Sequence, residues 1–419
     1  MVERSELTNG IRVVSERMEG VPSATLGIWV ENGSRDELRD QAGISHFLEH
    51  LLFKGTPTRS ASQIAEEIDS VGGGINAFTG KECTCYYVRV LSEHLGMAAD
   101  LLADIFTRSV FDPEEIERER GVVLQEISQG EDTPDEFIHD VFSAHYWRDH
   151  PLGSPICGTA QTVSALQRDD FTAFLAARYR PDRIVLAAAG NLHHRDLVDW
   201  AEREFGGLRG LSPAVEDRPP VTSHGLVTID KALEQVHLCL GAPGVSHISE
   251  DRYAAHVLNT ALGGGMSSRL FQEIREKRGR AYSVFSFLSC YRDTGYLGVY
   301  AGTSVEWVDE VLEIVARELR DVARNGLAPA ELDRAKNQLK GGMLLGLETS
   351  DSRMTRVAKN EIYFGRHFSI DEVANRIDAT TNEEVLSFAE RLTASDSMAL
   401  AVLGRVGTRD LGAGLLHAH

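Results

Sequence analysis

The sequence repeats one order of elements on either side of a glycine- and proline-rich segment near its midpoint. This segment, 206–224 with the sequence GGLRGLSPAVEDRPPVTSH, interrupts patterns that are typical of strands and helices. The strand expected at 25–30 has a counterpart at 237–240, and each is followed by a helix, expected at 43–53 and 253–262. An internal duplication of this kind predicts two similar domains instead of one continuous core.

The later parts of the two halves also match. The stretch DPEEIERER at 112–120 resembles APAELDRAK at 328–336, and in both a proline near the helix start precedes acidic residues, as the helix dipole favours. Each half ends on an apolar strand, expected at 183–190 and 397–404.

The repeated order predicts an α+β fold of two homologous α/β-sandwich domains. In each half, helices are expected to pack on a largely antiparallel sheet. The predicted N-terminal domain is 1–210, the linker is 211–223 and the C-terminal domain is 224–419. A chain of 419 residues is long enough for two such cores, because one domain usually takes about 100 to 200 residues.

Charge and hydropathy exclude several classes of partner. With Lys+Arg 43 and Asp+Glu 63 the net charge is -20, which repels nucleic acid and anionic membranes and favours basic peptides. The mean hydropathy is -0.20, and no apolar run approaches the roughly 18 residues of a membrane span. The start, MVERSE, lacks the apolar core of a secretory signal, and five cysteines without C-x-x-C predict reduced thiols. We expect a cytoplasmic protein.

The helix expected at 43–53 carries two imidazoles and a carboxylate on one face. His46 and His50 are four positions apart, and Glu49 lies beside His50. Two neutral imidazoles can hold a zinc ion, and the glutamate can act as general base toward a metal-bound water. A helix with two histidines by chance is the alternative for this motif alone.

A catalytic zinc needs a third protein ligand and an open fourth position. The helix expected at 112–129 becomes apolar near its end, so Glu126 lies beside its buried stripe. Glu119 lies about two turns earlier on the same face. It can orient a ligand histidine, and a solvated surface position is the alternative for Glu119.

The spacing His46-Phe-Leu-Glu-His50, followed 76 positions later by Glu126, resembles the signature of the pitrilysin-type inverted zinc peptidases, the inverzincins. Four further segments resemble this family: GGGINAFT at 72–79, Glu82 with Tyr86-Tyr87, GGGMSSRLF at 263–271 and GRAYSV at 279–284. Length and duplication resemble its short branch, which includes the β subunit of mitochondrial processing peptidase and bacterial relatives.

The resemblance implies one Zn²⁺ per chain and a role for each residue of the set. The implied zinc ligands are His46, His50 and Glu126, the general base is Glu49 and the supporting acid is Glu119. The matching positions of the second half cannot bind a catalytic zinc, because they are His256, Asn259, Thr260 and Gly342. The resemblance therefore implies one active site per chain.

The second domain is implied to supply Arg275 and Tyr282. The tyrosine hydroxyl can stabilise the oxyanion of a tetrahedral intermediate, and the arginine can hold a substrate carbonyl or support the tyrosine. From the residues alone, the alternatives are a surface ion pair for Arg275 and a buried strand position for Tyr282.

A substrate-binding edge strand is also implied. Three glycines permit unusual backbone angles before the strand expected at 76–90, on which Cys83, Cys85 and Tyr87 share a face. In the family such an edge adds the substrate as a further strand, which implies that peptide contacts Asn76, Ala77, Phe78 and Glu82. An ordinary hairpin strand is the alternative.

These observations predict a zinc endopeptidase that cleaves unfolded peptides or oligopeptides, basic ones in particular. Family members close into a clamshell chamber, which implies a homodimer in which Arg275 and Tyr282 face the zinc of the other subunit. The competing hypothesis is a non-catalytic peptide-binding or scaffold subunit, as in a heterodimer with an inactive homologue. The intact set of Glu49 and three ligands argues against this, and three protein ligands argue against a purely structural metal.

Overall fold

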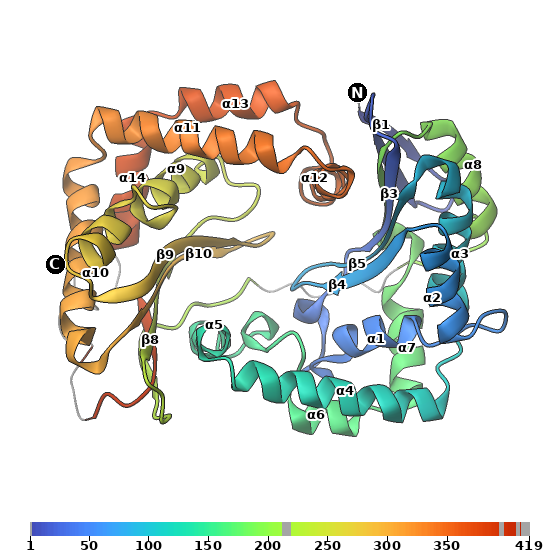
Figure 1. Ribbon diagram of the computed structural model, residues 1–419, viewed down its shortest axis with the longest axis horizontal. Coiled ribbons are helices and arrows are strands. Elements are labelled where there is room, and N and C mark those ends of the chain that lie inside the picture. Colours follow the sequence, from blue (N-terminus) through green and yellow to red (C-terminus); the bar gives the residue numbers. More distant parts are fainter. Residues whose placement is uncertain (1, 212–218, 394–397, 408–410, 412–419) are drawn as a thin grey trace. The chain divides into compact units, whose positions relative to one another are not determined.

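The chain forms two compact units in a computed structural model that describes residues 2–211, 219–393, 398–407 and 411. Unit 1 consists of Met1–Gln129, Ser154–Asp217 and Gly346–His367. Unit 2 consists of Gly130–Gly153, Arg218–Leu345 and Phe368–His419. Each unit is an α/β sandwich built on one sheet (Figure 1), and the predicted fold class is confirmed.

The sheet of unit 1 has six strands in the order β1-β2-β6-β3-β5-β4. Neighbouring strands are antiparallel except β2 and β6, which are parallel. The strands are β1 Val2–Glu6, β2 Arg12–Arg17, β3 Ser23–Val30, β4 Gly74–Thr79, β5 Thr84–Leu91 and β6 Ile184–Gly190. Strand β4 is therefore an edge of the sheet.

Helices cover both faces of this sheet. Leu26 and Ile28 of β3 belong to a buried cluster with α1, α3 and α8, whereas Trp29 points to the opposite face and packs against α12. There the indole Nε1 donates to Met354 Sδ at 3.1 Å. The helices of unit 1 are α1 Ile44–Leu52, α2 Ala61–Ser70, α3 Leu95–Arg108, α4 Pro113–Glu131, α6 Ala160–Ala165, α7 Arg168–Arg178, α8 His194–Phe205 and α12 Ser350–Phe364.

The sheet of unit 2 repeats this topology with five strands in the order β7-β11-β8-β10-β9, in which only β7 and β11 are parallel. The strands are β7 Gly225–Ile229, β8 Val236–Pro243, β9 Ala281–Cys290, β10 Gly295–Thr303 and β11 Ala399–Leu403. One face packs against α9, α10 and α14, and the other packs against α5. The helices are α5 Pro134–Tyr146, α9 Arg252–Gly263, α10 Val308–Asn325, α11 Pro329–Gly346, α13 Ile370–Ala379 and α14 Asn382–Thr393.

The two units differ from the predicted domain boundaries because two helices are exchanged. Helix α5 belongs to the first half of the sequence but packs on the sheet of unit 2, and α12 of the second half packs on the sheet of unit 1. The central strands of the two sheets, β3 and β8, are buried on both faces, so each sheet needs a helix on its second face as well. Residues 212–218 of the predicted linker lie outside the described residues.

The strand predicted at 76–90 is a hairpin of β4 and β5 instead of one strand. The N–H of Gly80 donates to the carbonyl oxygen of Cys83 at 2.8 Å and closes the turn. Glu82 lies in this turn, is buried, and accepts a hydrogen bond from Arg35 Nη1 at 2.8 Å. Its carboxylate therefore holds the hairpin turn, and its predicted contact with substrate stays a prediction.

Two further expectations concern membranes and thiols. No helix within the described ranges is both long enough and apolar enough to cross a membrane. All five cysteines are free, as predicted, and Cys83, Cys85 and Cys239 are buried.

Candidate metal centre

Helix α1 presents the histidines from a fixed N-terminus. Gly43 precedes the helix with φ 95, a left-handed conformation that suits glycine. Because glycine has no capping side chain, Glu37 takes that role, and its carboxylate accepts the N–H groups of Gly43 and Ser45 at 2.8 Å each. Burial raises the pKa of Glu37 to about 7, although these hydrogen bonds oppose the shift.

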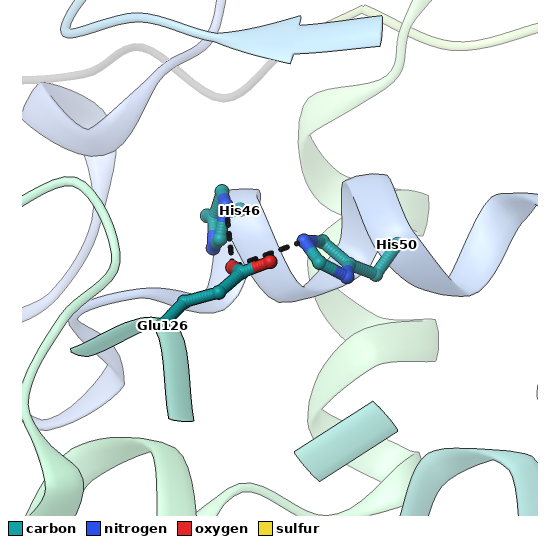
Figure 2. Close-up of side chains that lie close together, drawn as sticks. All are labelled: His46, His50 and Glu126. Atoms are coloured by element: carbon teal, nitrogen blue, oxygen red, sulfur yellow. Dashed lines mark ion pairs between the residues drawn. The ribbon is translucent and has the colours of Figure 1, made fainter. Parts of the chain in front are cut away.

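Helix α4 brings Glu126 to the same face of α1 (Figure 2). The Oε2 atom of Glu126 lies 3.7 Å from Nε2 of His46 and 3.5 Å from Nε2 of His50. Ligand atoms of a tetrahedral zinc site with bonds of about 2.0 to 2.1 Å are roughly 3.4 Å apart. The three donors therefore fit a zinc ion, and they are the only group of this kind within the described parts of the chain.

The protonation state of His46 suits a metal ligand. Burial, together with the charge of the neighbouring His50, lowers the pKa of His46 to about 4. A neutral imidazole, with a free electron pair on nitrogen, is the form that binds a metal.

Glu119 supports His50 from the other side of the ring. Its Oε2 lies 3.2 Å from Nδ1 of His50, and its Oε1 lies 2.6 Å from Nζ of Lys54. Glu119 is 5% exposed, so the alternative of a solvated surface glutamate is excluded. Nδ1 of His46 is also buried, and no hydrogen-bond partner for it occurs in the described part of the chain. Among the described residues, a carboxylate therefore contacts Nδ1 of His50 but not Nδ1 of His46.

We expect Glu119→Gln to weaken zinc binding by about 10- to 100-fold, because a carboxylate behind a ligand histidine fixes the ring and raises its basicity. Competition with a chromophoric chelator measures this affinity. Glu117→Gln is the matched control, since Glu117 is an exposed acid of the same helix whose partner is Arg120. Equal affinities in the wild type and Glu119→Gln would contradict the supporting role.

The carboxylate of Glu49 lies next to the edge strand β4. Thr79, the last residue of β4, donates from Oγ1 to Oε2 of Glu49 at 2.6 Å. Burial raises the pKa of Glu49, and the hydrogen bond from Thr79 opposes this shift. The predicted substrate residues precede Thr79 on this strand: Asn76 and Phe78 are exposed, and the N–H of Ala77 donates to Oδ1 of Asn76 at 2.8 Å.

In unit 2, the structure brings Arg275 and Tyr282 together. The guanidinium of Arg275, in the π-helical turn η6 (Phe271–Glu276), lies 4.9 Å from the ring centres of both Phe271 and Tyr282. Tyr282 is 77% exposed, which excludes a buried strand position. Arg275 also forms no ion pair with any described residue, which excludes the surface ion pair.

The second half has the predicted replacements at the matching elements. His256, Asn259 and Thr260 lie on α9, and Gly342 lies on α11. Four further residues, for which the sequence indicated no role, form contacts at these sites: Glu37, Lys54, Thr79 and Phe271. Glu37, Lys54 and Thr79 contact residues on other elements, so no spacing rule indicates them. Phe271 lies four positions before Arg275 in η6, and this spacing is the signal that indicates their contact.

The fold and this site define a duplicated α/β protein in which one group of described residues could hold a metal ion. A family model described as "Insulinase (Peptidase family M16)" matches residues 12–160, and one described as "Peptidase M16 inactive domain" matches residues 165–339. The chain belongs to peptidase family M16.

Several curated relatives match nearly the whole chain. The uncharacterized zinc protease YmxG of Bacillus subtilis is 42% identical and covers 97% of this chain and 99% of its own length. An uncharacterized zinc protease of Mycobacterium tuberculosis is 45% identical over 97% of this chain and 94% of its own. A solved structure from Pseudomonas fluorescens, described as a peptidase M16 inactive domain, has a TM-score of 0.91 at 21% identity and covers 98% and 99% of the two chains. At that identity it shows the fold alone.

Proposed function

We propose that the protein is a zinc-dependent endopeptidase that cleaves unfolded peptides or oligopeptides. The observation that carries the proposal is the convergence of His46 and His50 of α1 with Glu126 of α4, with Glu49 also on α1. Relatives named zinc proteases support it. When bound, a zinc ion would supply Lewis-acid polarisation of the scissile carbonyl and would make water easier to deprotonate.

The proton transfers and the stabilisation of the oxyanion are proposed for the protein's own residues. Glu49 takes a proton from the attacking water as the new C–O bond forms and the carbonyl carbon becomes tetrahedral. Glu49 then delivers this proton to the nitrogen of the leaving amine as the C–N bond breaks. Thr79 orients Glu49 by donating to its Oε2. Tyr282 donates its hydroxyl hydrogen to the carbonyl oxygen as negative charge develops there, and Arg275 binds a neighbouring peptide carbonyl.

Strand β4 is proposed to hold the peptide. As an edge strand it can pair with an extended substrate through its backbone, which gives affinity without a strict side-chain preference. Because β4 ends at Thr79, a peptide along this edge passes the carboxylate of Glu49. The net charge of -20 favours basic peptides.

The proposal is tested with a quenched basic peptide of about 15 to 25 residues, a length sufficient for β4 and its surroundings. We expect the zinc-loaded protein to cleave it, the chelated protein to lose activity, and stoichiometric zinc to restore it. An acidic peptide of the same length is the control and should be cleaved more slowly. If protein with one zinc per chain cuts neither peptide, the scaffold function becomes the better account.

We further propose a homodimer in which Arg275 and Tyr282 act at the metal centre of the other copy. Glu49→Gln and Tyr282→Phe are each expected to be inactive alone. After unfolding and refolding together they should regain about a quarter of wild-type activity, since half of the dimers are mixed and each mixed dimer has one complete site. Light scattering measures whether the protein is a dimer. A mixture that stays inactive would show that Tyr282 acts at the metal centre of its own chain.

A further inference from the structure

The turn that carries Arg275 has a rare geometry. In η6 the N–H of Lys277 donates to the carbonyl oxygen of Gln272 at 3.0 Å, five residues back. Such π-helical turns are uncommon, occur often at functional sites, and persist where the surrounding structure holds them. The contacts that hold η6 are therefore informative about Arg275.

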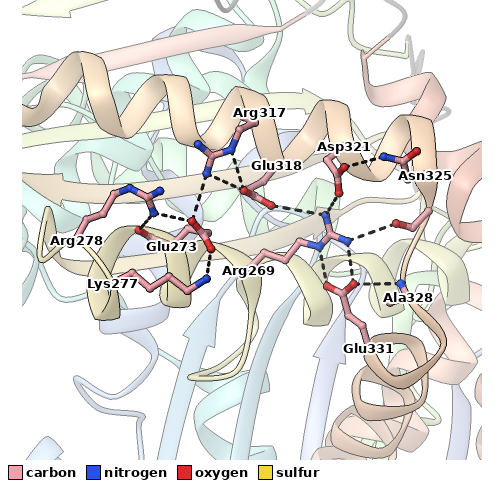
Figure 3. Close-up of polar contacts among 11 residues, drawn as sticks. Arg269, Glu273, Lys277, Arg278, Arg317, Glu318, Asp321, Asn325, Ala328 and Glu331 are labelled. Atoms are coloured by element: carbon pink, nitrogen blue, oxygen red, sulfur yellow. Dashed lines mark hydrogen bonds and ion pairs between the residues drawn. The ribbon is translucent and has the colours of Figure 1, made fainter.

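Arg269, just before η6, is the first of these contacts (Figure 3). Its Nε and Nη2 donate to the two carboxylate oxygens of Glu331 on α11 at 2.6 and 2.8 Å. Its Nη1 donates to Asp321 of α10 at 2.6 Å. A bidentate pair of this kind fixes both distance and orientation, so the chain enters η6 from a fixed point.

Glu273, inside η6, is the second contact. It accepts a hydrogen bond from Arg278 Nη1 at 2.6 Å, binds Lys277, and lies 3.4 Å from Nη2 of Arg317 on α10 (Figure 3). Arg317 also binds Glu318, which lies 3.6 Å from Arg269, and so joins the two contacts. We call this set the α10 ionic network: Arg269, Glu273, Lys277, Arg278, Arg317, Glu318, Asp321 and Glu331.

The network explains why Arg275 has no carboxylate partner among the described residues of this acidic chain. Arg275 lies two positions after Glu273, and residues two apart on a helix do not face each other. Glu273 is also occupied by three cations of the network. Arg275 instead lies against the rings of Phe271 and Tyr282. A guanidinium that rests on ring faces keeps N–H donors available for a ligand.

We propose that Arg269 and Glu273 are positioning residues for the reaction, because they hold η6 so that Arg275 and Tyr282 present their donors to the peptide. This inference rests on the proposed peptidase function. On this proposal, the α10 ionic network affects substrate binding and turnover although none of its residues contacts the substrate.

The test is a double-mutant cycle between Arg269 and Arg275. Arg269→Lys keeps the charge but cannot form the bidentate pair with Glu331. We expect it to lower kcat/KM for the basic peptide by about tenfold in the wild type, and by less than about twofold in Arg275→Ala, because coupled residues are not additive. Zinc content should stay unchanged. An equal loss in both backgrounds would overturn the inference, because a general structural defect acts independently of Arg275.

Two further variants distinguish the positioning role from a folding defect. Arg317→Ala removes the link between Glu318 and Glu273 at a side chain that is 52% exposed, and should give a smaller loss that also vanishes in Arg275→Ala. Arg376→Ala is the control, because it removes an exposed pair with Glu250 and a contact with the ring of Tyr253, neither of which belongs to the α10 ionic network, and it should leave activity unchanged. If Arg269→Lys does not fold, the Arg317→Ala cycle decides by the same criterion.

Peptide binding separates this inference from the proposed function. The same cycle is measured in Glu49→Gln by fluorescence anisotropy of the labelled basic peptide, which needs no turnover. If the wild type cleaves nothing, yet Arg269→Lys weakens binding several-fold only when Arg275 is present, the peptidase proposal fails and the positioning role stands. If the wild type cleaves but both cycles are additive, the positioning role fails alone.

Discussion

Glu49→Gln is expected to lower the rate of peptide cleavage by about 10²- to 10⁴-fold, the usual contribution of a general base. The amide has nearly the same shape as the carboxylate and can still accept the hydrogen bond from Thr79, which is 2.6 Å long in the wild type. It cannot take a proton from water at neutral pH. The loss should therefore appear in kcat, while KM for the peptide changes little.

Zinc content distinguishes this result from damage to the metal centre. Because His46, His50 and Glu126 are unchanged, Glu49→Gln should retain about one zinc per chain, measured by elemental analysis. Glu66→Gln, an exposed acid on α2 whose partner is Ser62, is the control and should match the wild type. A Glu49→Gln protein that keeps zinc and cleaves at the wild-type rate would refute the assigned base.

The second large effect is expected on stability, at the buried carboxylate of Asp104. Asp104 of α3 is fully buried and accepts four hydrogen bonds. The donors are Thr56 at 2.8 Å, Thr58 at 3.0 Å, Arg59 at 2.7 Å and Arg108 at 2.6 Å. Three of these donors lie in the segment directly after α1, so Asp104 fastens the end of the metal-binding helix to α3.

We expect Asp104→Ala to lower the free energy of unfolding by about 3 to 5 kcal/mol, because it leaves Arg59 and two hydroxyls without their buried acceptor. Urea denaturation of the metal-free protein measures the loss. Asp100→Ala is the matched control on the same helix, since Asp100 forms an exposed pair with Arg203 and should cost less than about 1 kcal/mol. Equal losses in the two variants would show that the buried acceptor is not what stabilises this segment.

The effect of Asp104 should also depend on pH. Burial alone would raise the pKa of Asp104, but the hydrogen bonds from Arg59, Arg108 and the two threonines lower it from 3.8 to about 2. Since the folded pKa is below the unfolded one, the stabilisation is fully present above 3.8 and is lost as the pH falls toward about 2. The difference between the wild type and Asp104→Asn should therefore shrink as the pH falls from 3.8 toward about 2. A constant difference would contradict this origin.

Local sequence spacing determined the elements and the face of the metal site. His46, Glu49 and His50 share a face because helix geometry fixes positions three and four apart, whatever the rest of the fold does. The apolar end of α4 placed Glu126 beside the buried stripe in the same way. The duplicated order of elements predicted two sandwiches, because each half carries one sheet and the helices that cover it.

Only the tertiary structure decided which surfaces these elements meet. An amphipathic helix indicates that one face is buried but not against which sheet, so the exchange of α5 and α12 between the units was not predictable from either half. The same holds for polar contacts: whether Glu119 is solvated or supports His50, and whether Arg275 pairs with an acid or rests on Tyr282, depends on neighbours far away in the sequence. Periodicity follows from bonds along one chain, whereas partner choice follows from packing between segments, and packing requires all of them to be in place.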